Sequence, residues 1–232
     1  GCYWNSGGVL NYNTASSTAP CSSTNTCICL SAGLTAQLSG NIWTSTSSGS
    51  SWTNRETTGS NIYISTITSS ADGTKLAAVG GSIIWTSIDS GSSWTNRKTI
   101  NYVISITSSA DGTKLAAVVS SGNIWTSIDS GSSWIEVTSI GSTKYWKSIT
   151  SSDDGTKLAA VALYGIWTST NSGSTWISVG HAKGWNFMTS SADGTKLAGL
   201  DNYYGNGCNI WTSSNSGVTW TENTDTGPKK TW

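Results

Sequence analysis

Charged residues are scarce in this sequence, and the two signs cancel. Lysine and arginine number 12 and aspartate and glutamate number 12, so that charged residues make up 10% of the chain. An average soluble domain contains about 25%. A protein that binds phosphates or an anionic lipid surface needs a concentration of basic residues. We therefore expect no nucleic-acid partner and no attraction to an anionic membrane.

Long apolar runs and the motifs of common cofactor sites are also missing. No stretch of about 18 consecutive apolar residues occurs, so no membrane insertion is expected. The sequence contains a single histidine and no glycine-rich phosphate loop, Walker lysine or zinc-ligand spacing. We expect neither a metal nor another cofactor.

Cysteine is limited to five positions, namely Cys2, Cys21, Cys27, Cys29 and Cys208. Because zinc-ligand spacing is absent, we interpret these residues as disulfide partners in a secreted protein, with one left over. Buried free thiols are the alternative. Cys27 and Cys29 would share one face of a strand and would therefore bond elsewhere. The chain begins with glycine and not methionine, so we expect that a leader was removed or that the chain is a fragment.

The sequence is dominated by a repeat. Residues 85–94 read WTSIDSGSSW, and residues 125–134 are identical to them. The same motif recurs with small changes at 43–52, 167–176 and 211–220. The copies lie about 40 to 44 residues apart, a period typical of proteins built from repeated supersecondary units.

Each copy is predicted to contain a β-hairpin turn. Its Ile-Trp-Thr-Ser run is β-branched and aromatic, as strands are, and the Asp-Ser-Gly that follows is typical of a turn. A side-chain oxygen able to cap backbone N–H groups stands at the same place in every copy: Ser47, Asp89, Asp129, Asn171 and Asn215. Because the charge is not kept, we interpret these residues as structural turn caps and not as catalytic acids or metal ligands. The closing tryptophan of each copy is expected to pack over its own turn.

A second motif precedes each of the last four copies. It reads SADGTKLAAV at residues 70–79, and related versions begin at Ser109, Ser152 and Ser191. Asp-Gly between two strand-like runs predicts a hairpin, so each unit supplies four short strands. In the second unit we expect them at 63–69, 75–79, 83–87 and 93–96.

Two features of the units indicate where the core lies. The Leu-Ala-Ala-Val run is continuously apolar and small, as in a strand buried between neighbouring sheets. Trp146 and Trp185 occupy the unit position held elsewhere by Ile64 and Val103. We therefore expect these two tryptophans in the core.

The pattern Ser87-x-Asp89-x-Gly91-x-Ser93-Trp94 resembles the Asp-box, the bacterial neuraminidase repeat Ser-x-Asp-x-Gly-x-Thr-Trp. Five such motifs span about three quarters of the chain. The resemblance implies a β-propeller, in which the Asp-box turn joins the third and fourth strands of each blade.

We therefore predict an all-β fold, a β-propeller of five four-stranded antiparallel blades. Residues 1–26 are expected to form a non-repeat arm rich in cysteine, serine and threonine, and residues 27–232 the Asp-box propeller. A propeller of six blades, with one blade assembled from the two termini, is the alternative. A disulfide from Cys208 to a cysteine near the N terminus would join the last unit to the first, although the sequence does not fix the pairing.

The resemblance to sialidases can be examined at the residues that their chemistry needs. Sialidases of this family hold the substrate carboxylate with three arginines, whereas this chain has only Arg55 and Arg97. A tyrosine–glutamate nucleophile pair would need Glu56, Glu136 or Glu222, which all follow the outer strand of a unit. The remaining carboxylates show no evident pairing of the kind that glycosidases use. We expect that the chain is not an enzyme.

Variation between units indicates where a binding site would lie. The Asp-Gly and Asp-box turns hardly vary and are expected to share one face, while the loops of the opposite face vary. The variable loops include residues 136–145, 179–184 and 201–207. In the last of them Asp201, Asn202, Tyr203 and Tyr204 are adjacent, and sugars stack on such rings beside Asn and Asp. These four residues are the candidate ligand-binding residues.

The sequence favours a secreted, non-catalytic propeller that serves as a structural or adhesive building block of an extracellular assembly, filamentous and glycosylated. An uncharged, hydroxyl-rich composition, an odd cysteine and the non-repeat arm support this hypothesis. The expected partners are other copies of the chain, or extracellular matrix and surface glycoproteins. The alternative is a multivalent carbohydrate-binding lectin with repeated glycan sites, because linked weak sites gain avidity.

Overall fold

The computed structural model describes residues 27–32, 40–55, 64–141, 143–202 and 208–223. These ranges contain strands, turns and bends but no helix, so no described helix is long and apolar enough to cross a membrane. The prediction of an all-β fold is confirmed. Residues 1–26 lie outside the described ranges, and their assignment to an arm stays a prediction.

The strands follow the repeat of the sequence, and neighbouring strands pair antiparallel. The first two units contain β1 (Cys27–Ala32), β2 (Gly40–Ser45), β3 (Thr53–Arg55), β4 (Ile64–Ser69), β5 (Leu76–Gly80), β6 (Ile83–Ser87) and β7 (Thr95–Thr99). The third unit contains β8 (Val103–Ser108), β9 (Leu115–Gly122), β10 (Ile124–Ser127) and β11 (Ile135–Val137). The last two units contain β12 (Lys144–Ser151), β13 (Leu158–Ala162), β14 (Tyr164–Ser169), β15 (Ile177–Ser190), β16 (Leu197–Asn202), β17 (Cys208–Ser213) and β18 (Thr221–Asn223).

The predicted strands of the second unit correspond to β4, β5, β6 and β7, with the fourth shifted toward the C terminus. One expectation about the links between units is wrong. Residues 179–184 were expected to form a variable loop, but they lie within β15, which closes the fourth unit and opens the fifth. Gly180 and Gly184 both pair with β14, and the register shifts between them, so the strand bends without ending.

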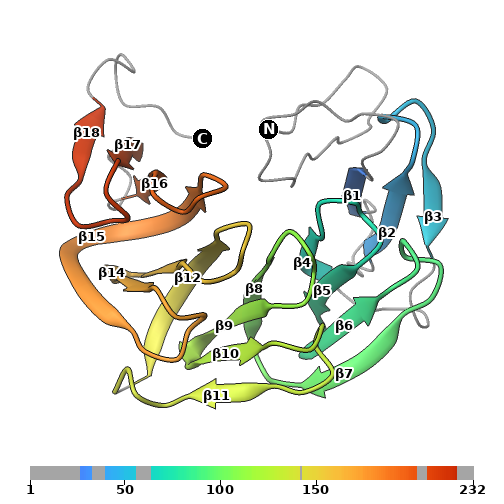
Figure 1. Ribbon diagram of the computed structural model, residues 1–232, viewed down its shortest axis with the longest axis horizontal. Helices are drawn as coiled ribbons and strands as arrows, with labels where there is room; N and C mark the ends of the chain where they lie inside the picture. Colours follow the sequence, from blue (N-terminus) through green and yellow to red (C-terminus); the bar gives the residue numbers. More distant parts are fainter. Residues whose placement is uncertain (1–26, 33–39, 56–63, 142, 203–207, 224–232) are drawn as a thin grey trace.

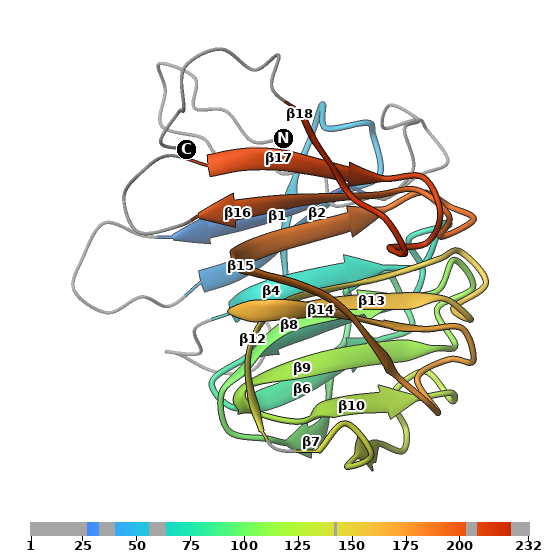
Figure 2. The same ribbon diagram turned by 90° about the vertical axis from the view of Figure 1, so that its left-hand side faces the viewer.

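The units succeed one another around an arc. The first and second units form separate sheets of three and four strands, and the other three units are joined into one sheet through β12 and β15. From the second unit to the fifth, the first strand of each unit contacts that of the next, β4 with β8, β8 with β12 and β12 with β15. Figure 1 shows β4 and β8 near the centre of the arc, while the long strand β15 starts at its outer rim and runs inward. The first and last units lie at the two ends of the arc. In the edge-on view of Figure 2, most strands run across the view in roughly the same direction, with the connecting turns at its two sides. This is the arrangement of a β-propeller, while the number of blades in a complete ring stays a prediction.

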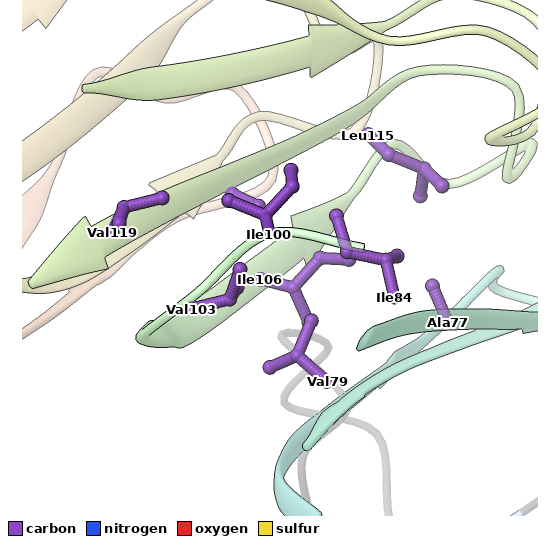
Figure 3. Packing of buried hydrophobic residues seen from close by; sticks show 9 residues of the cluster. Ala77, Val79, Ile84, Ile100, Val103, Ile106, Leu115 and Val119 are labelled. Carbon is purple, nitrogen blue, oxygen red and sulfur yellow. The ribbon is translucent and has the colours of Figure 1, made fainter. Parts of the chain in front are cut away.

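The core lies between neighbouring units. The second strand of the unit is buried along its whole length in β5 and in β13, as expected for the Leu-Ala-Ala-Val run. Ala77, Val79 and Ile84 of the second unit pack against Ile106 and Leu115 of the third (Figure 3). Each sheet therefore buries its face against the next unit, and a single unit has no core of its own.

Trp146 and Trp185 are each 1% exposed, which confirms that both belong to the core. The Trp146 indole N–H donates to the Gly122 carbonyl at 3.0 Å, and the ring packs edge-on against Trp167 with centroids 5.1 Å apart. Trp185 lies 5.4 Å from Trp220 between ring centroids. In these two units a tryptophan fills the volume that Ile64 or Val103 fills elsewhere.

Candidate functional site

The turns of the repeated tryptophan-bounded motif, which we call the Asp-box turns for their resemblance to that motif, use their polar groups internally. In the second unit the Asp89 carboxylate accepts hydrogen bonds from the Ser87 hydroxyl at 2.7 Å, the Ser93 N–H at 2.8 Å and the Ser93 hydroxyl at 2.6 Å. The Ser87 oxygen in turn accepts from the Gly91 N–H at 2.8 Å. Asp129 has the same set of partners in the third unit. The carboxylate closes the turn and leaves little accepting capacity for a ligand.

Asparagine makes the corresponding bonds in the last two units. The Asn171 side-chain oxygen accepts from the Ser169 hydroxyl at 3.0 Å and the Thr175 N–H at 2.9 Å, and its amide group donates to the Thr175 hydroxyl at 2.8 Å. Asn215 repeats this pattern with the residues of its own turn. In the first unit the Ser47 hydroxyl accepts from the Ser51 N–H at 2.9 Å. All five side chains named as turn caps therefore bond the backbone of their own turn.

The closing tryptophan of each copy lies over its turn. In the second unit the Trp94 indole N–H donates to the Gly91 carbonyl at 3.1 Å. The same bond, at 3.0 to 3.1 Å, is made by Trp52, Trp134, Trp176 and Trp220. Gly91 has a φ of 83°, a conformation that glycine adopts without steric cost.

The Asp-Gly turns lie on the same face as the Asp-box turns. Asp72 accepts from the Ser70 hydroxyl at 2.6 Å and the Thr74 N–H at 3.0 Å. The Ser90 N–H of the Asp-box turn donates to the Thr74 carbonyl of the Asp-Gly turn at 2.9 Å. This bond recurs in the next three units. We call the surface formed by both kinds of turn the turn face.

The aspartates of the turn face are held in their charged form. The Ser93 hydroxyl, with help from the Ser93 N–H, lowers the pKa of Asp89 to about 2. The Ser109 hydroxyl does the same for Asp111, whose pKa is also about 2. The pKa is lowered, through serine hydroxyls and backbone N–H groups, at the equivalent residues Asp72, Asp129, Asp154 and Asp193. A general acid needs the opposite shift, so the geometry of these residues suits turn formation.

The candidate ligand residue Asp201 lies inside the last unit. Its side chain is 4% exposed and accepts from the Asn209 N–H at 2.8 Å and the Trp211 indole N–H at 3.0 Å. In the second unit the corresponding indole N–H, that of Trp85, is buried with no hydrogen-bond partner in the described structure. Asp201 therefore satisfies a buried donor of its own unit.

The other predicted site residues cannot be placed as side chains. Asn202 belongs to β16, where it pairs with Cys208 of β17, and Tyr203 and Tyr204 lie outside the described residues. Cys27 and Cys29 are in β1, and Cys2 and Cys21 lie outside the described ranges. The glycan site and the disulfide pairing stay predictions. In the part of the chain that the structure describes, no three His, Cys, Asp or Glu side chains are grouped so that they could hold a metal ion.

Exposed tyrosines mark the face opposite the turn face, which we call the variable face. Tyr102 is 74% exposed, Tyr145 62% and Tyr164 57%. Tyr102 and Tyr145 occupy the same unit position, because their carbonyls accept from the N–H groups of Ser120 and Leu163 in the same manner. Sequence reasoning missed this pair, although aligning the units at Val103 and Trp146 places the two tyrosines together.

Lysine side chains lie over tryptophan rings in the units that follow the second. The ammonium nitrogen is 5.0 Å from the ring centroid for Lys98 and Trp125, and 4.9 Å for Lys144 and Trp167. For Lys183 and Trp211 the distance is 4.2 Å. These distances are those of cation–π contacts. The lysines therefore combine positive charge with packing against these rings.

Comparison with known proteins finds no matching family model and no matching curated protein. Solved structures do match. The GH74 xyloglucanase from Xanthomonas campestris superposes with a TM-score of 0.65 at 11% identity, covering 87% of this chain and 37% of that chain. An ancestral GH74 enzyme gives 0.62 at 16% identity, covering 81% and 29%. A chain of a nidogen/laminin complex gives 0.62 at 10% identity, covering 85% and 74%.

These neighbours are β-propeller proteins, and the likeness establishes the fold of this chain. The chain spans well under half the length of the two GH74 enzymes that it matches. The comparison also corrects the expectation that the chain is not an enzyme. That expectation rested on missing sialidase residues, but glycoside hydrolases of the GH74 type share this fold, so the exclusion was wrong.

Proposed function

We propose that the chain is an extracellular β-propeller protein of the Asp-box type that serves as a structural or adhesive building block. The observation that carries the proposal is the contrast between its two faces. On the turn face the repeated pattern of serine, aspartate or asparagine, glycine and tryptophan is bonded within each unit. The variable face presents exposed tyrosines, which are the residues that interfaces favour.

The extracellular setting is supported by composition. The chain is 10% charged and has five cysteines, which suits a secreted protein with disulfides. A separate apolar cluster is buried at each junction between neighbouring units, so the described units are packed into one frame. A packed frame with one variable surface is suited to presenting contacts to other copies or to surface glycoproteins.

The test is to find the protein in its native source. An antibody raised against the recombinant chain would be used to fractionate cells and medium, and the native mass of the recovered protein would be measured. We expect recovery outside the cell, within an assembly larger than one chain, with glycans attached. Recovery only as an intracellular monomer would contradict the proposal.

A lectin is the second candidate, favoured by the equivalent exposure of Tyr102 and Tyr145. Tyrosine rings can stack on sugars, and the hydroxyl can bond to them. On a glycan array, Tyr102→Ala with Tyr145→Ala should lower binding more than tenfold, since two linked sites lose avidity together. The control is Ile88→Ala with Ile128→Ala, two exposed residues of the turn face. No binding across a broad array would rule out this function.

A further inference from the structure

A groove of about 440 Å³ opens on the side of the last unit that faces away from the fourth unit. The described residues that line it all belong to that unit and include Lys196, Leu197, Ala198, Thr212, Ser213 and Thr219. They come from β16, β17 and the two turns, which are the parts that face the next unit elsewhere in the arc.

At internal interfaces the same groove is almost filled. About 20 Å³ remains between the fourth and fifth units, and about 10 Å³ between the second and third. The next unit fills it with the glycines of its two turns. A Cβ on Gly217 would lie 3.2 Å from the Thr168 methyl, and one on Gly194 would lie 3.0 Å from the Lys157 Cβ. The groove is thus shaped for a turn backbone without a side chain.

Hydrogen bonds hold the two turns of each unit in the groove of the preceding unit. The ammonium groups of Lys75, Lys114 and Lys157 donate to a carbonyl of the next unit's Asp-Gly turn at 2.6 to 2.9 Å. Lys196 is the equivalent residue of the last unit, and it is exposed, with no such partner among the described residues. The groove of the last unit therefore contains a lysine ammonium group that the second, third and fourth units use to bind the next turn.

The apolar lining shows the same difference. Ala77, Ala116 and Ala159 are 1%, 1% and 3% exposed, whereas the equivalent Ala198 is half-buried. Thr44 and Thr86 are buried, whereas the equivalent Thr212 is exposed. Among the described residues, no other unit covers these side chains of the last unit.

The first unit has the complementary feature. The Asp-box glycines Gly91, Gly131, Gly173 and Gly217 are buried, and a Cβ on each would touch the threonine of the preceding unit. Gly49 of the first unit is only half-buried, and a Cβ there would meet nothing but Trp52 at 3.8 Å. Among the described residues, the first unit therefore has a turn that lies in no groove, and the last unit has a groove that no turn fills. Figure 1 shows these two units at the two ends of the arc.

We propose that the groove of the last unit binds the Asp-box turn at residues 45–52 of a second copy, head to tail. Thr212 would pack on Gly49, as Thr168 packs on Gly217. A second copy is the occupant because the described turn and the described groove belong to the first and last units, which lie at opposite ends of the arc (Figure 1). The contact is heterologous, so each copy keeps a free end and the association continues. This inference rests on the proposed building-block function and names its partner surface.

The test uses the full chain and two variants that each block one side of the contact. Thr212→Trp fills the groove at an exposed position. Ser48→Arg adds bulk to the turn, where the equivalent Ser130 and Ser216 line the neighbouring groove. The control is Ile128→Trp, at an exposed turn position outside the interfaces. Native mass is measured by analytical ultracentrifugation across a hundredfold range of concentration.

We expect the mass of the unmodified chain and of Ile128→Trp to rise with concentration, while Thr212→Trp and Ser48→Arg each stay monomeric. An equimolar mixture of the two blocked variants should form a heterodimer and nothing larger, because one free turn and one free groove remain. A monomeric unmodified chain, with no heterodimer in the mixture, would overturn the inference. If, in addition, Thr212→Trp were less stable than the unmodified chain, the groove of the last unit would be filled by the first unit of the same chain.

The outcome can be separated from that of the proposed function. A chain that stays monomeric in this assay but is recovered in an extracellular assembly contradicts head-to-tail docking alone. A chain that associates head to tail but is found inside the cell contradicts the proposed function alone.

Discussion

The turn face and the variable face are built from the two ends of the same strands, yet their side chains behave differently. On the turn face nearly identical hydrogen bonds recur from unit to unit, for example around Asp89 and Asp129. On the variable face the equivalent positions hold different residues, and Tyr102 and Tyr145 extend into solvent. The turn face thus specifies the fold, and the variable face carries the differences between units.

The comparison predicts that substitutions on the turn face reduce stability. Gly131→Ala should lower the free energy of unfolding by about 3 kcal/mol, since a Cβ at φ 82° would lie 2.8 Å from the Thr86 methyl of the preceding unit. Gly141→Ala is the matched control, with φ 86° and no atom within 4 Å. It should cost about 1 kcal/mol, from backbone strain alone. Equal losses in denaturant unfolding would show that the packing between units contributes nothing.

Removal of the tryptophan that covers a turn should have the next largest effect. Trp94 is half-buried and bonded to Gly91, so Trp94→Ala should cost about 2 to 3 kcal/mol, below the range for a fully buried ring. Tyr145→Ala on the variable face should change the free energy of unfolding by less than about 0.5 kcal/mol. A large loss at Tyr145 would mean that the variable face also stabilises the fold.

Acid should weaken the turn face. The folded pKa of Asp89, Asp111, Asp129 and Asp154 is about 2, below the ordinary value of about 3.9. A lowered folded pKa contributes stability that is present above the unfolded pKa and is lost as pH falls through the folded pKa. We therefore expect the free energy of unfolding to decline between about pH 4 and 2, by little per residue because these carboxylates are exposed to solvent. A stability that stays flat over this range would contradict the hydrogen-bond assignment.

The sequence predicts the turn face well because its structure is local. Asp89, Gly91 and Trp94 bond within a few residues of one another, so a repeated motif is enough to predict the turn and the strands beside it. The burial of Trp146 and Trp185 was also predictable, since the units could be compared position by position.

Side-chain contacts between strands and between units could not be predicted in this way. Asp201 bonds Trp211, which lies on the adjacent strand β17, and Lys98 lies over Trp125 of the following unit. Such pairs depend on how strands and units are placed relative to one another, which a motif does not state. The continuity of β15 was missed for the same reason. Residues 179–184 were interpreted as a loop from their composition, whereas their pairing with β14 makes them part of a strand.

The smallest loss of stability is expected at the turn cap, where aspartate and asparagine replace each other between units. Asp89→Ala removes the acceptor of two bonds to Ser93 and should cost about 1 kcal/mol, as the loss of a cap does. Asp89→Asn should cost almost nothing if Ser93 is changed to Thr with it, because Asn171 and Thr175 form this pair in the fourth unit. The two variants are compared by denaturant unfolding and in the native-mass assay. If the Asn and Thr pair folds normally but loses association or binding, the charge of Asp89 has a role beyond the turn, and the separation of the two faces does not hold.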